Sequence, residues 1–308
     1  MTVLDVVLDK TLPFDMRWNL VKRQPRVALS KHQIDTFWKE GYLTIPDFID
    51  VAQVDEIDRS FQRLFRTRAG WKEGDFYDIA GLDQGDEFKL PQLLHPAKYA
   101  PELLRTVFWA NAEAVAKALL GADARFSFDH AISKPPHPES ATPWHQDQAF
   151  HRAGSHVENI TIWLPLQDVD EENGCLTFVP QSHTGPMLTH RNYRDDKRIE
   201  GLEAVGVDLD KAVTVPMRKG SVSIHHSRTL HYAGPNLSSQ PRKVYSLLFA
   251  VQKPEPVVAV DYPWNLDKPT ARLERKRAYE QRWSNRAQRR IKNALSSTLH
   301  RVIGRGGR

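Results

Sequence analysis

The tripeptide His145-Gln146-Asp147, together with the distant His231 in Leu230-His231-Tyr232-Ala233-Gly234-Pro235-Asn236, restricts the fold of this chain most strongly. Two imidazoles and one carboxylate are the ligand set that holds non-haem ferrous iron on one face and leaves the other face open. In a strand, side chains alternate, so His145 and Asp147 point the same way and Gln146 points away. The third ligand must then come from a remote segment, for which His231 is a candidate. The pattern predicts an oxygenase, because iron with open positions binds oxygen and an oxidisable co-substrate.

Two simpler interpretations compete with this one. An isolated His-x-Asp also arises in a turn, where the aspartate caps a helix and the histidine lies on the surface. The chain also contains 13 histidines, of which His225 and His226 are the main alternatives to His231 as the third ligand. The tripeptide alone therefore does not establish a metal site, and the surrounding sequence has to decide.

Downstream of residue 124, short β-rich runs separated by Gly, Pro and Asn predict an antiparallel barrel or sandwich. The expected strands cover residues 125–132, 159–166, 176–179, 212–215, 221–225 and 244–251. Upstream, caps and helical periodicity predict a strand at 42–45 and helices over 30–41, 50–68 and 101–121. Helices followed by strands indicate helices packed outside a β core. Residues 69–95 and 182–210 fit no element and are expected to be lids or binding loops.

Four motifs occur in the order in which one family carries them: Pro143-Trp144-His145-Gln146-Asp147, Asp168-Val169-Asp170-Glu171-Glu172-Asn173-Gly174-Cys175-Leu176, Val179-Pro180-Gln181-Ser182-His183 and Leu230-His231-Tyr232-Ala233-Gly234-Pro235-Asn236. From about residue 28 to about residue 252 the chain resembles the phytanoyl-CoA dioxygenase family. The resemblance implies a mainly β fold with flanking helices, a double-stranded β-helix or jelly roll. It also implies iron(II), 2-oxoglutarate and oxygen as cofactor and co-substrates.

Carried over to this sequence, the resemblance makes His145, Asp147 and His231 the iron ligands. Relatives often have a histidine at the position of His226 without using it as a ligand. For His225 we expect packing or a hydrogen bond instead of metal binding. Joined to the later motif, the His-x-Asp pattern therefore predicts a metal centre.

The resemblance also implies contacts to 2-oxoglutarate. Arg242 lies eleven residues after His231, where the family places the arginine that holds the far carboxylate. A guanidinium suits this task because it matches a carboxylate with two hydrogen bonds and stays charged when buried. Lys134 and Trp163 resemble residues near the co-substrate, and Thr161 shares a strand face with Trp163 and is expected to donate a hydrogen bond. The alternatives are a surface salt bridge for Arg242, ordinary core for Trp163 and a solvated strand end for Lys134.

The implied activity is hydroxylation of an unactivated C–H bond in a small metabolite, with release of succinate and CO2. A natural-product intermediate of secondary metabolism, a lipid and a sugar all remain open as substrates. The same cofactors also support desaturation, epoxidation, cyclisation or endoperoxidation. A different class also remains open, a non-catalytic jelly roll that binds metal and acts as a binding or sensor module.

A single cysteine, Cys175, allows no internal disulfide, so we expect a reducing, cytoplasmic location. The first residues lack the basic-then-apolar order of a signal peptide, and no apolar run is long enough to span a bilayer. Asn173-Gly174 is expected to form a turn between strands, and Cys175 after it to be a buried structural residue.

The net charge of +5 is unevenly distributed. Residues 272–308 contain twelve Lys or Arg against two Glu, so this tail carries +10 and the rest of the chain −5. We divide the chain into a dioxygenase domain at 1–270 and a basic amphipathic tail at 271–308. The tail is expected to cover the acidic body, to make a dimer contact or to lie on an anionic membrane. Too few aromatic residues accompany the basic ones to predict nucleic-acid binding.

Overall fold

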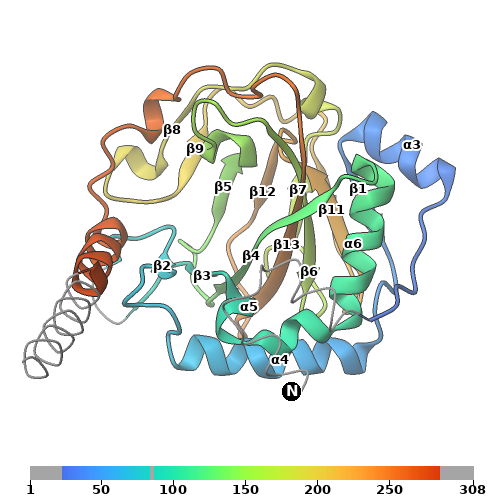
Figure 1. The fold of residues 1–308 in the computed structure, drawn as a ribbon, viewed down its shortest axis with the longest axis horizontal. Helices are drawn as coiled ribbons and strands as arrows, with labels where there is room; N and C mark the ends of the chain where they lie inside the picture. Colours follow the sequence, from blue (N-terminus) through green and yellow to red (C-terminus); the bar gives the residue numbers. More distant parts are fainter. Residues whose placement is uncertain (1–22, 84–86, 285–308) are drawn as a thin grey trace, which may run out of the picture.

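The structure, a computed structural model, describes residues 23–83 and 87–284. Within these residues it contains two larger antiparallel sheets and a two-stranded one (Figure 1). The larger sheet has seven strands, in the spatial order β1 (Tyr42–Ile45), β11 (Val222–His226), β6 (Val157–Pro165), β13 (Arg242–Gln252), β4 (Arg125–Lys134), β3 (Pro91–Leu94) and β2 (Phe76–Asp78). The smaller has four, in the order β10 (Val213–Val215), β7 (Leu176–Phe178), β12 (His231–Ala233) and β5 (Thr142–His145). A mainly β fold with flanking helices is thus confirmed.

Helices α3 (Lys31–Glu40) and α4 (Val51–Arg66) begin and end as their local sequences predict. The Ser30 hydroxyl accepts a hydrogen bond from the Gln33 backbone N–H at 3.2 Å, and the Gln33 side chain accepts one from the Ser30 N–H at 2.9 Å. Gly41 ends α3 with a φ of +82°, a conformation that costs residues with a Cβ but not glycine.

The third helix was predicted from the wrong start. Pro101 begins a separate 3-10 turn, η1 (Pro101–Arg105), and the long helix α6 (Val107–Leu120) starts only after Thr106. The Thr106 hydroxyl caps α6 by accepting from the Trp109 backbone N–H at 3.4 Å. A further short helix, α5 (Pro96–Tyr99), was not predicted, because four residues are too few to show a helical period.

The six strands predicted downstream of residue 124 are present, each displaced by at most a few residues at its ends. The two unassigned stretches contain structure that was missed. Residues 69–95 hold β2 and β3, and residues 182–210 hold the two-stranded pair β8 (His190–Asn192) and β9 (Leu202–Ala204) and the 3-10 turns η3 (Ser182–Thr184) and η4 (Tyr193–Asp195). The remaining 3-10 turns are η2 (Asp147–Phe150) and η5 (Pro263–Asn265).

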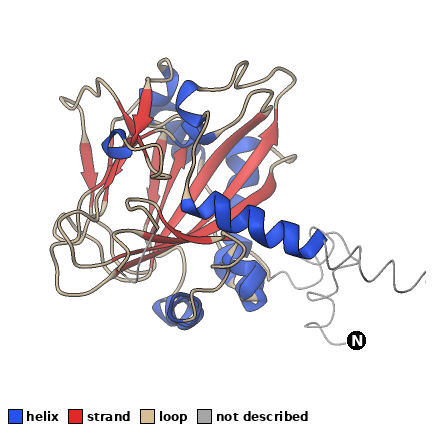
Figure 2. Cartoon of the chain, turned by 90° about the vertical axis from the view of Figure 1, so that its left-hand side faces the viewer, coloured by secondary structure: helices blue, strands red, loops and turns tan. Residues whose placement is uncertain are grey.

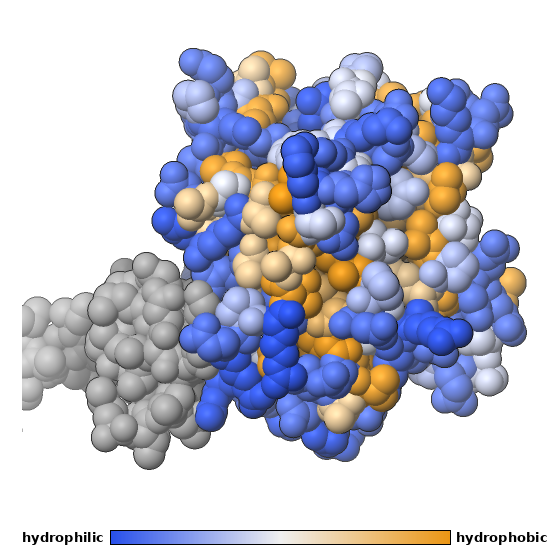
Figure 3. All heavy atoms as spheres, turned by 90° about the vertical axis from the view of Figure 1, so that its right-hand side faces the viewer, coloured by the Kyte–Doolittle hydropathy of each residue, from blue (hydrophilic) through white to orange (hydrophobic). Residues whose placement is uncertain are grey.

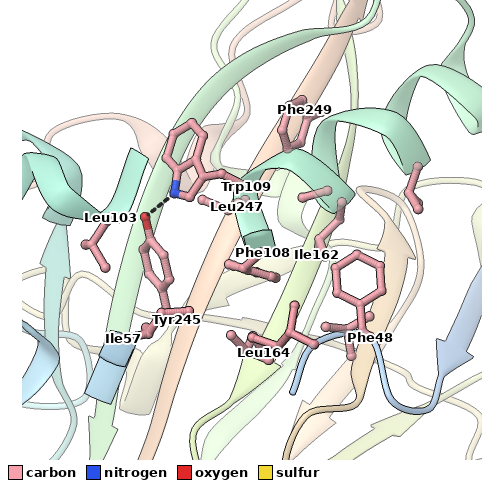
Figure 4. Packing of buried hydrophobic residues seen from close by; sticks show 14 of the residues in the cluster. Phe48, Ile57, Leu103, Phe108, Trp109, Ile162, Leu164, Tyr245, Leu247 and Phe249 are labelled. Atoms are coloured by element: carbon pink, nitrogen blue, oxygen red, sulfur yellow. Dashed lines mark hydrogen bonds between the residues drawn. The ribbon is translucent and has the colours of Figure 1, made fainter. Parts of the chain in front are cut away.

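The larger sheet has one apolar face and one polar face. Helices α4 and α6 cover the apolar face, where residues such as Phe108, Ile162 and Leu247 are fully buried (Figure 4). Burying a side chain of this size contributes roughly 1.5–3 kcal/mol. The opposite face turns towards the smaller sheet, and the Tyr42 ring stacks on Phe178 across the gap at 4.5 Å. This inner face is where polar and ionisable side chains gather.

Figure 3 views the side that carries α3 and α6. Hydrophobic residues form a band there, between hydrophilic margins. The helical layer therefore leaves some apolar surface exposed, as is usual for folded proteins.

The first half of the predicted tail folds onto the body. Residues 271–284 form a helix (Figure 2) that lies beside β2 (Figure 1), where Arg275 Nη2 donates to the carbonyl of Phe76 at 3.2 Å. The Arg275 guanidinium carbon lies 3.5 Å from the centre of the Trp71 ring, and its Nη2 pairs with Asp83. This contact agrees with a tail that covers the acidic body. The remaining tail residues, 285–308, lie outside the described residues, and the division at residue 270 stays a prediction. Within the described ranges, no helix is long and apolar enough to cross a membrane.

Tyr245 joins α6 to the sheet through its hydroxyl. It accepts a hydrogen bond from Trp109 Nε1 at 2.9 Å (Figure 4). It donates one to Asp129 Oδ2, also at 2.9 Å. Tyr245→Phe is expected to lower the free energy of unfolding by about 2–3 kcal/mol, because two buried hydrogen bonds are lost. Urea unfolding measures the effect, and Tyr262→Phe is the matched control. An equal, small loss in both variants would contradict the role assigned to the Tyr245 hydroxyl.

Candidate metal centre

Two neighbouring strands of the smaller sheet bring the predicted ligands together. His145 is the last residue of β5, His231 is the first of β12, and the two are register partners. Asp147 begins η2, so the strand predicted to carry both members of the His-x-Asp motif ends at His145. Gln146 nevertheless keeps an extended backbone, with φ −118° and ψ 128°, and the alternation of side chains still holds.

Gln146 points away from the site and fixes the loops around it. Its Nε2 donates to the carbonyl of Arg228 at 2.8 Å, and its Oε1 accepts from the Leu188 backbone N–H at 3.0 Å. The backbone N–H of Gln146 donates to His190 Nε2 at 3.1 Å. The residue between the two candidate ligands is therefore completely buried and rigidly held.

Each candidate histidine is held in one tautomer by a backbone carbonyl. His145 Nδ1 lies 2.8 Å from the carbonyl of Pro143, and His231 Nδ1 lies 2.9 Å from that of Thr229. Because a carbonyl only accepts, Nδ1 carries the proton in both rings. Both Nε2 atoms are then left with a free lone pair, which is the state that binds a metal.

The two Nε2 atoms converge on one oxygen of Asp147. Asp147 Oδ1 lies 3.4 Å from His145 Nε2 and 3.7 Å from His231 Nε2, and one ligand atom from each residue lies within 4.8 Å of the others. Metal bonds of roughly 2.1 Å at right angles would separate such donors by about 3 Å. The donor set and its spacing therefore fit a divalent iron held on one face.

The protonation states agree with metal binding. Burial raises the pKa of Asp147, but His231, His145 and His225 outweigh it and hold this pKa well below the usual range. Burial, together with His145 and His225, holds the pKa of His231 well below its usual value. An ionised carboxylate and a neutral imidazole are the forms in which these residues act as ligands.

The second oxygen of Asp147 is held by groups on the larger sheet. The Thr161 hydroxyl on β6 donates to Asp147 Oδ2 at 2.8 Å, and His225 Nε2 on β11 lies 3.3 Å from the same oxygen. Thr161 and His225 are register partners, so one row of the sheet supports the carboxylate. The structure thus uses the Thr161 hydroxyl on Asp147, and the predicted contact of Thr161 to 2-oxoglutarate stays a prediction.

Because the Thr161 hydroxyl holds Asp147, its removal is expected to weaken metal binding. With Asp147 as a ligand, Thr161→Val is expected to raise the dissociation constant for Fe(II) about tenfold or more, because outer-shell partners commonly contribute that much. Anaerobic titration against a competing chelator measures it. Thr214→Val on β10 is the matched control, and unchanged affinity in Thr161→Val would show that this hydroxyl does not position the carboxylate.

Two other histidines, His226 and His183, make their contacts away from the centre. His226 Nδ1 accepts from the Arg228 backbone N–H, and its Nε2 lies 3.1 Å from Glu158 Oε1. His183, in η3, directs Nε2 to the carbonyl of Trp38 at 3.0 Å. Neither belongs to the group of convergent ligand atoms among the described residues.

Arg242 is a buried cation that has no anionic partner among the described residues. Arg242 is the first residue of β13 and pairs in register with Lys134. It is 2 % exposed, and its guanidinium carbon lies 5.4 Å from the centre of the Trp163 ring. In the described part of the chain it forms no ion pair, and its Nε has no hydrogen-bond acceptor. Burial lowers the pKa of Arg242 to about 9. Burying such a charge is costly unless an anion accompanies it, so the site fits a carboxylate ligand.

Lys134 is not a solvated strand end, and that alternative was wrong. Its side chain is fully buried, and Nζ donates to the carbonyls of Ala233, at 2.9 Å, and Gly234. Both carbonyls follow His231 closely, so Lys134 fixes the strand that carries this histidine. Cys175 is buried as predicted, and burial raises the pKa of its thiol to about 11.

Two serines on the same inner face were missed from the sequence. Ser223 on β11 and Ser246 on β13 both pair in register with Trp163, which stands between them. Both are fully buried, and neither hydroxyl has a hydrogen-bond partner among the described residues. Buried polar atoms without partners are rare, so this row beside Arg242 marks a place for a polar ligand. For Ser246, its position directly before the apolar run Leu247-Leu248-Phe249 was the available signal.

A cavity of about 530 Å³ opens beside the candidate ligands. His145 and Asp147 form part of its wall, whereas Arg242, Lys134 and Trp163 do not line it. Much of the wall is apolar, with Leu94, Phe128, Ile132, Phe150, Leu202 and Leu248 among its residues. A cavity of this size suits a small organic molecule.

Comparison with known proteins places these features in a family. Residues 37–244 match the family model described as phytanoyl-CoA dioxygenase (PhyH). A protein of Stutzerimonas stutzeri named as a probable alpha-ketoglutarate-dependent hypophosphite dioxygenase is 31 % identical over 228 residues, which cover 71 % of this chain and 78 % of that protein.

Solved structures agree with the fold and the co-substrate. The crystal structure of EvdO2 from Micromonospora carbonacea var. aurantiaca is 35 % identical, with a TM-score of 0.68 over 79 % of this chain and 99 % of that one. A second EvdO2 structure, complexed with 2-oxoglutarate, is 31 % identical with a TM-score of 0.65 over the same shares. The carbocyclase SnoK from nogalamycin biosynthesis is 23 % identical, with a TM-score of 0.58 over 76 % of this chain and 91 % of SnoK, and shares the fold. The predicted jelly roll is thereby confirmed.

Proposed function

The chain belongs to the phytanoyl-CoA dioxygenase family of iron- and 2-oxoglutarate-dependent oxygenases, and from that premise we propose that it hydroxylates an unactivated C–H bond of a small metabolite. The observation that carries the proposal is the position of the centre. His145 and Asp147 belong to a convergent ligand group and also line a cavity large enough for an organic substrate.

In this proposal, His145, Asp147 and His231 hold iron(II), and the carbonyl-bound Nδ1 atoms keep both rings in the binding tautomer. When bound, iron(II) and 2-oxoglutarate supply the oxidising chemistry that consumes oxygen and releases succinate and CO2. The protein supplies orientation, because Thr161 and Gln146 fix the ligands on either side of the centre.

Arg242 is proposed to bind the far carboxylate of 2-oxoglutarate. Its burial and the lack of an anionic partner in the described ranges support this role, and Ser223 and Ser246 offer further donors beside it. Trp163 and Lys134 close the same region, since Trp163 packs against the guanidinium and Lys134 sits opposite it in the strand pair. A co-substrate held there leaves the 530 Å³ cavity for the substrate.

The volume of the cavity indicates the size of the substrate. The Stutzerimonas relative is named for hypophosphite, an ion of few atoms. A cavity of about 530 Å³ falls within the range that binds organic ligands, roughly 300–1,000 Å³. The proposed substrate is therefore an organic molecule that places one C–H bond near His145 and Asp147.

Oxygen-dependent product formation tests the proposal. The purified protein is incubated with Fe(II), 2-oxoglutarate and metabolite extracts under ¹⁸O2, and products are followed by mass spectrometry together with succinate. We expect substrate-dependent succinate and a product that gains one labelled oxygen atom. A product that loses two hydrogens instead would replace hydroxylation by desaturation or ring closure. Substrate-dependent succinate that persists in His145→Ala would overturn the proposed centre.

A further inference from the structure

Three cationic side chains stand in the wall of the substrate cavity. Arg152 follows η2, and Lys268 and Arg272 come from the segment that enters the C-terminal helix. We call these three residues the cationic wall. They share the cavity with His145 and Asp147, so a molecule bound against them also lies in the space next to the proposed metal centre.

Two members of the cationic wall each donate one hydrogen bond within the described part of the chain, which leaves further donors for a ligand. Lys268 Nζ donates to the backbone carbonyl of Glu200 at 3.1 Å, and Arg152 Nη1 donates to that of Asn265 at 3.1 Å. Neither has a carboxylate within 4.0 Å among the described residues. Lys268 is half-buried and Arg152 is exposed, and in each case the carbonyl accepts a hydrogen bond without neutralising the charge.

Arg272 is anchored more fully. Its Nε donates to the carbonyl of Gly74 at 2.7 Å, its guanidinium lies 4.4 Å from the centre of the Tyr77 ring, and Nη1 lies 3.5 Å from Glu200 Oε2. Arg272 therefore shapes the wall as well as contributing charge.

The charges around the cavity do not balance. Outside the proposed metal centre, Glu200 is the one carboxylate among the described lining residues, against three cations. Glu200 is itself engaged, since it accepts a hydrogen bond from the Thr270 hydroxyl at 2.5 Å. Burial lowers the pKa of Lys268 to about 8; Glu200 opposes this shift, and the smaller effect of Arg152 adds to it. An anion in the cavity would offset the burial of the Lys268 ammonium group and its repulsion by Arg152.

We propose that the cationic wall binds an anionic group, a phosphate or a carboxylate, on the substrate of this enzyme. The inference rests on the proposed function, because it names the class of molecule that the same cavity accepts. The apolar body of the substrate lies along Phe128, Ile132 and Leu248, and Lys268 and Arg152 hold its charged end. Anchoring one end fixes which C–H bond reaches the metal centre.

Matched eight-carbon probes test the proposal. Octyl phosphate, octanoate and octanol share an apolar chain and differ in their head groups. Anaerobic isothermal titration calorimetry of the protein loaded with Fe(II) and 2-oxoglutarate gives their dissociation constants. We expect at least one anion to bind about tenfold or more tightly than octanol, because charge-assisted hydrogen bonds contribute on that scale. The two anionic arms show whether phosphate or carboxylate is preferred.

Substitutions test whether the cationic wall causes the preference for anions. Arg152→Gln/Lys268→Met is expected to remove the preference for the anion and to leave octanol binding unchanged, which also shows that the variant is folded. Arg218→Gln/Lys211→Met changes the same residue types at exposed positions outside the cavity lining and is expected to keep the preference. The preference should also weaken as salt is added.

The outcomes separate this inference from the proposed function. Anions that bind no more tightly than octanol, or not measurably, overturn it, and so does a preference that survives in Arg152→Gln/Lys268→Met. If the protein forms no complex with Fe(II) and 2-oxoglutarate, the proposed function fails instead. The titration is then repeated on the metal-free protein, where a preference that depends on Lys268 and Arg152 still supports an anion site.

Discussion

His231→Ala is expected to abolish the visible absorption band that the protein develops when Fe(II) and 2-oxoglutarate are added without oxygen. The substitution removes one of the three proposed donors and leaves His145 and Asp147 alone on the metal. Loss of an outer-shell partner already costs 10–100-fold in metal affinity or activity, so loss of a ligand should lower turnover by more than about a hundredfold. Anaerobic absorption spectra and succinate formation measure the two effects.

His225 and His226 were the alternatives for the third ligand, so variants at these positions test whether His231 alone fills that role. His226→Ala is expected to keep the band, since both ring nitrogens of His226 are engaged away from the centre. His225→Phe should weaken iron binding without abolishing it, because His225 touches Asp147 but lies outside the convergent group. A band that survives in His231→Ala and disappears in His225→Phe would reverse the assignment.

Local sequence was sufficient wherever local interactions decide the structure. The capping box at Ser30 and the glycine at position 41 predicted both ends of α3, because a cap acts within one turn. The same reasoning misplaced the start of α6, because Pro101 suits the first turn of a 3-10 helix equally well. Strands β2, β3, β8 and β9 each contain a residue that strands disfavour, such as Asp78, Pro91, Asn192 or Glu203, and form through pairing with other segments. The equally short β10, Val213–Val215, lacks such residues and was predicted.

Some residues of the candidate site could likewise be predicted from local sequence, and others could not. The spacing within His145-Gln146-Asp147 and the family motif around His231 were visible in the chain. The supports of the site depend instead on register between strands. Ser223 and Ser246 reach the same place only because both pair with Trp163, and the burial of Lys134 follows from its position opposite Arg242. No local pattern states which strands are neighbours, so these residues required the structure.

Arg242→Met is expected to raise the dissociation constant for 2-oxoglutarate at least about thirtyfold, which corresponds to about 2 kcal/mol, because one partner of a buried charge pair is lost. Fe(II) affinity should change little, since Arg242 is not among the ligand atoms. Titrating 2-oxoglutarate at fixed Fe(II) and recording the absorption band gives the constant.

The same substitution has an unusual expected effect on stability. Without 2-oxoglutarate, wild-type Arg242 is a buried charge with no ion-pair partner among the described residues, and an apolar side chain of similar length removes that cost. Arg242→Met should therefore unfold at the same or a higher urea concentration than the wild type when 2-oxoglutarate is absent. Adding 2-oxoglutarate and Fe(II) should stabilise the wild type more than the variant. Arg218→Met, at an exposed position, is the control and should respond like the wild type. Unchanged 2-oxoglutarate affinity combined with clear destabilisation would make Arg242 a structural residue, and the carboxylate would have to bind elsewhere.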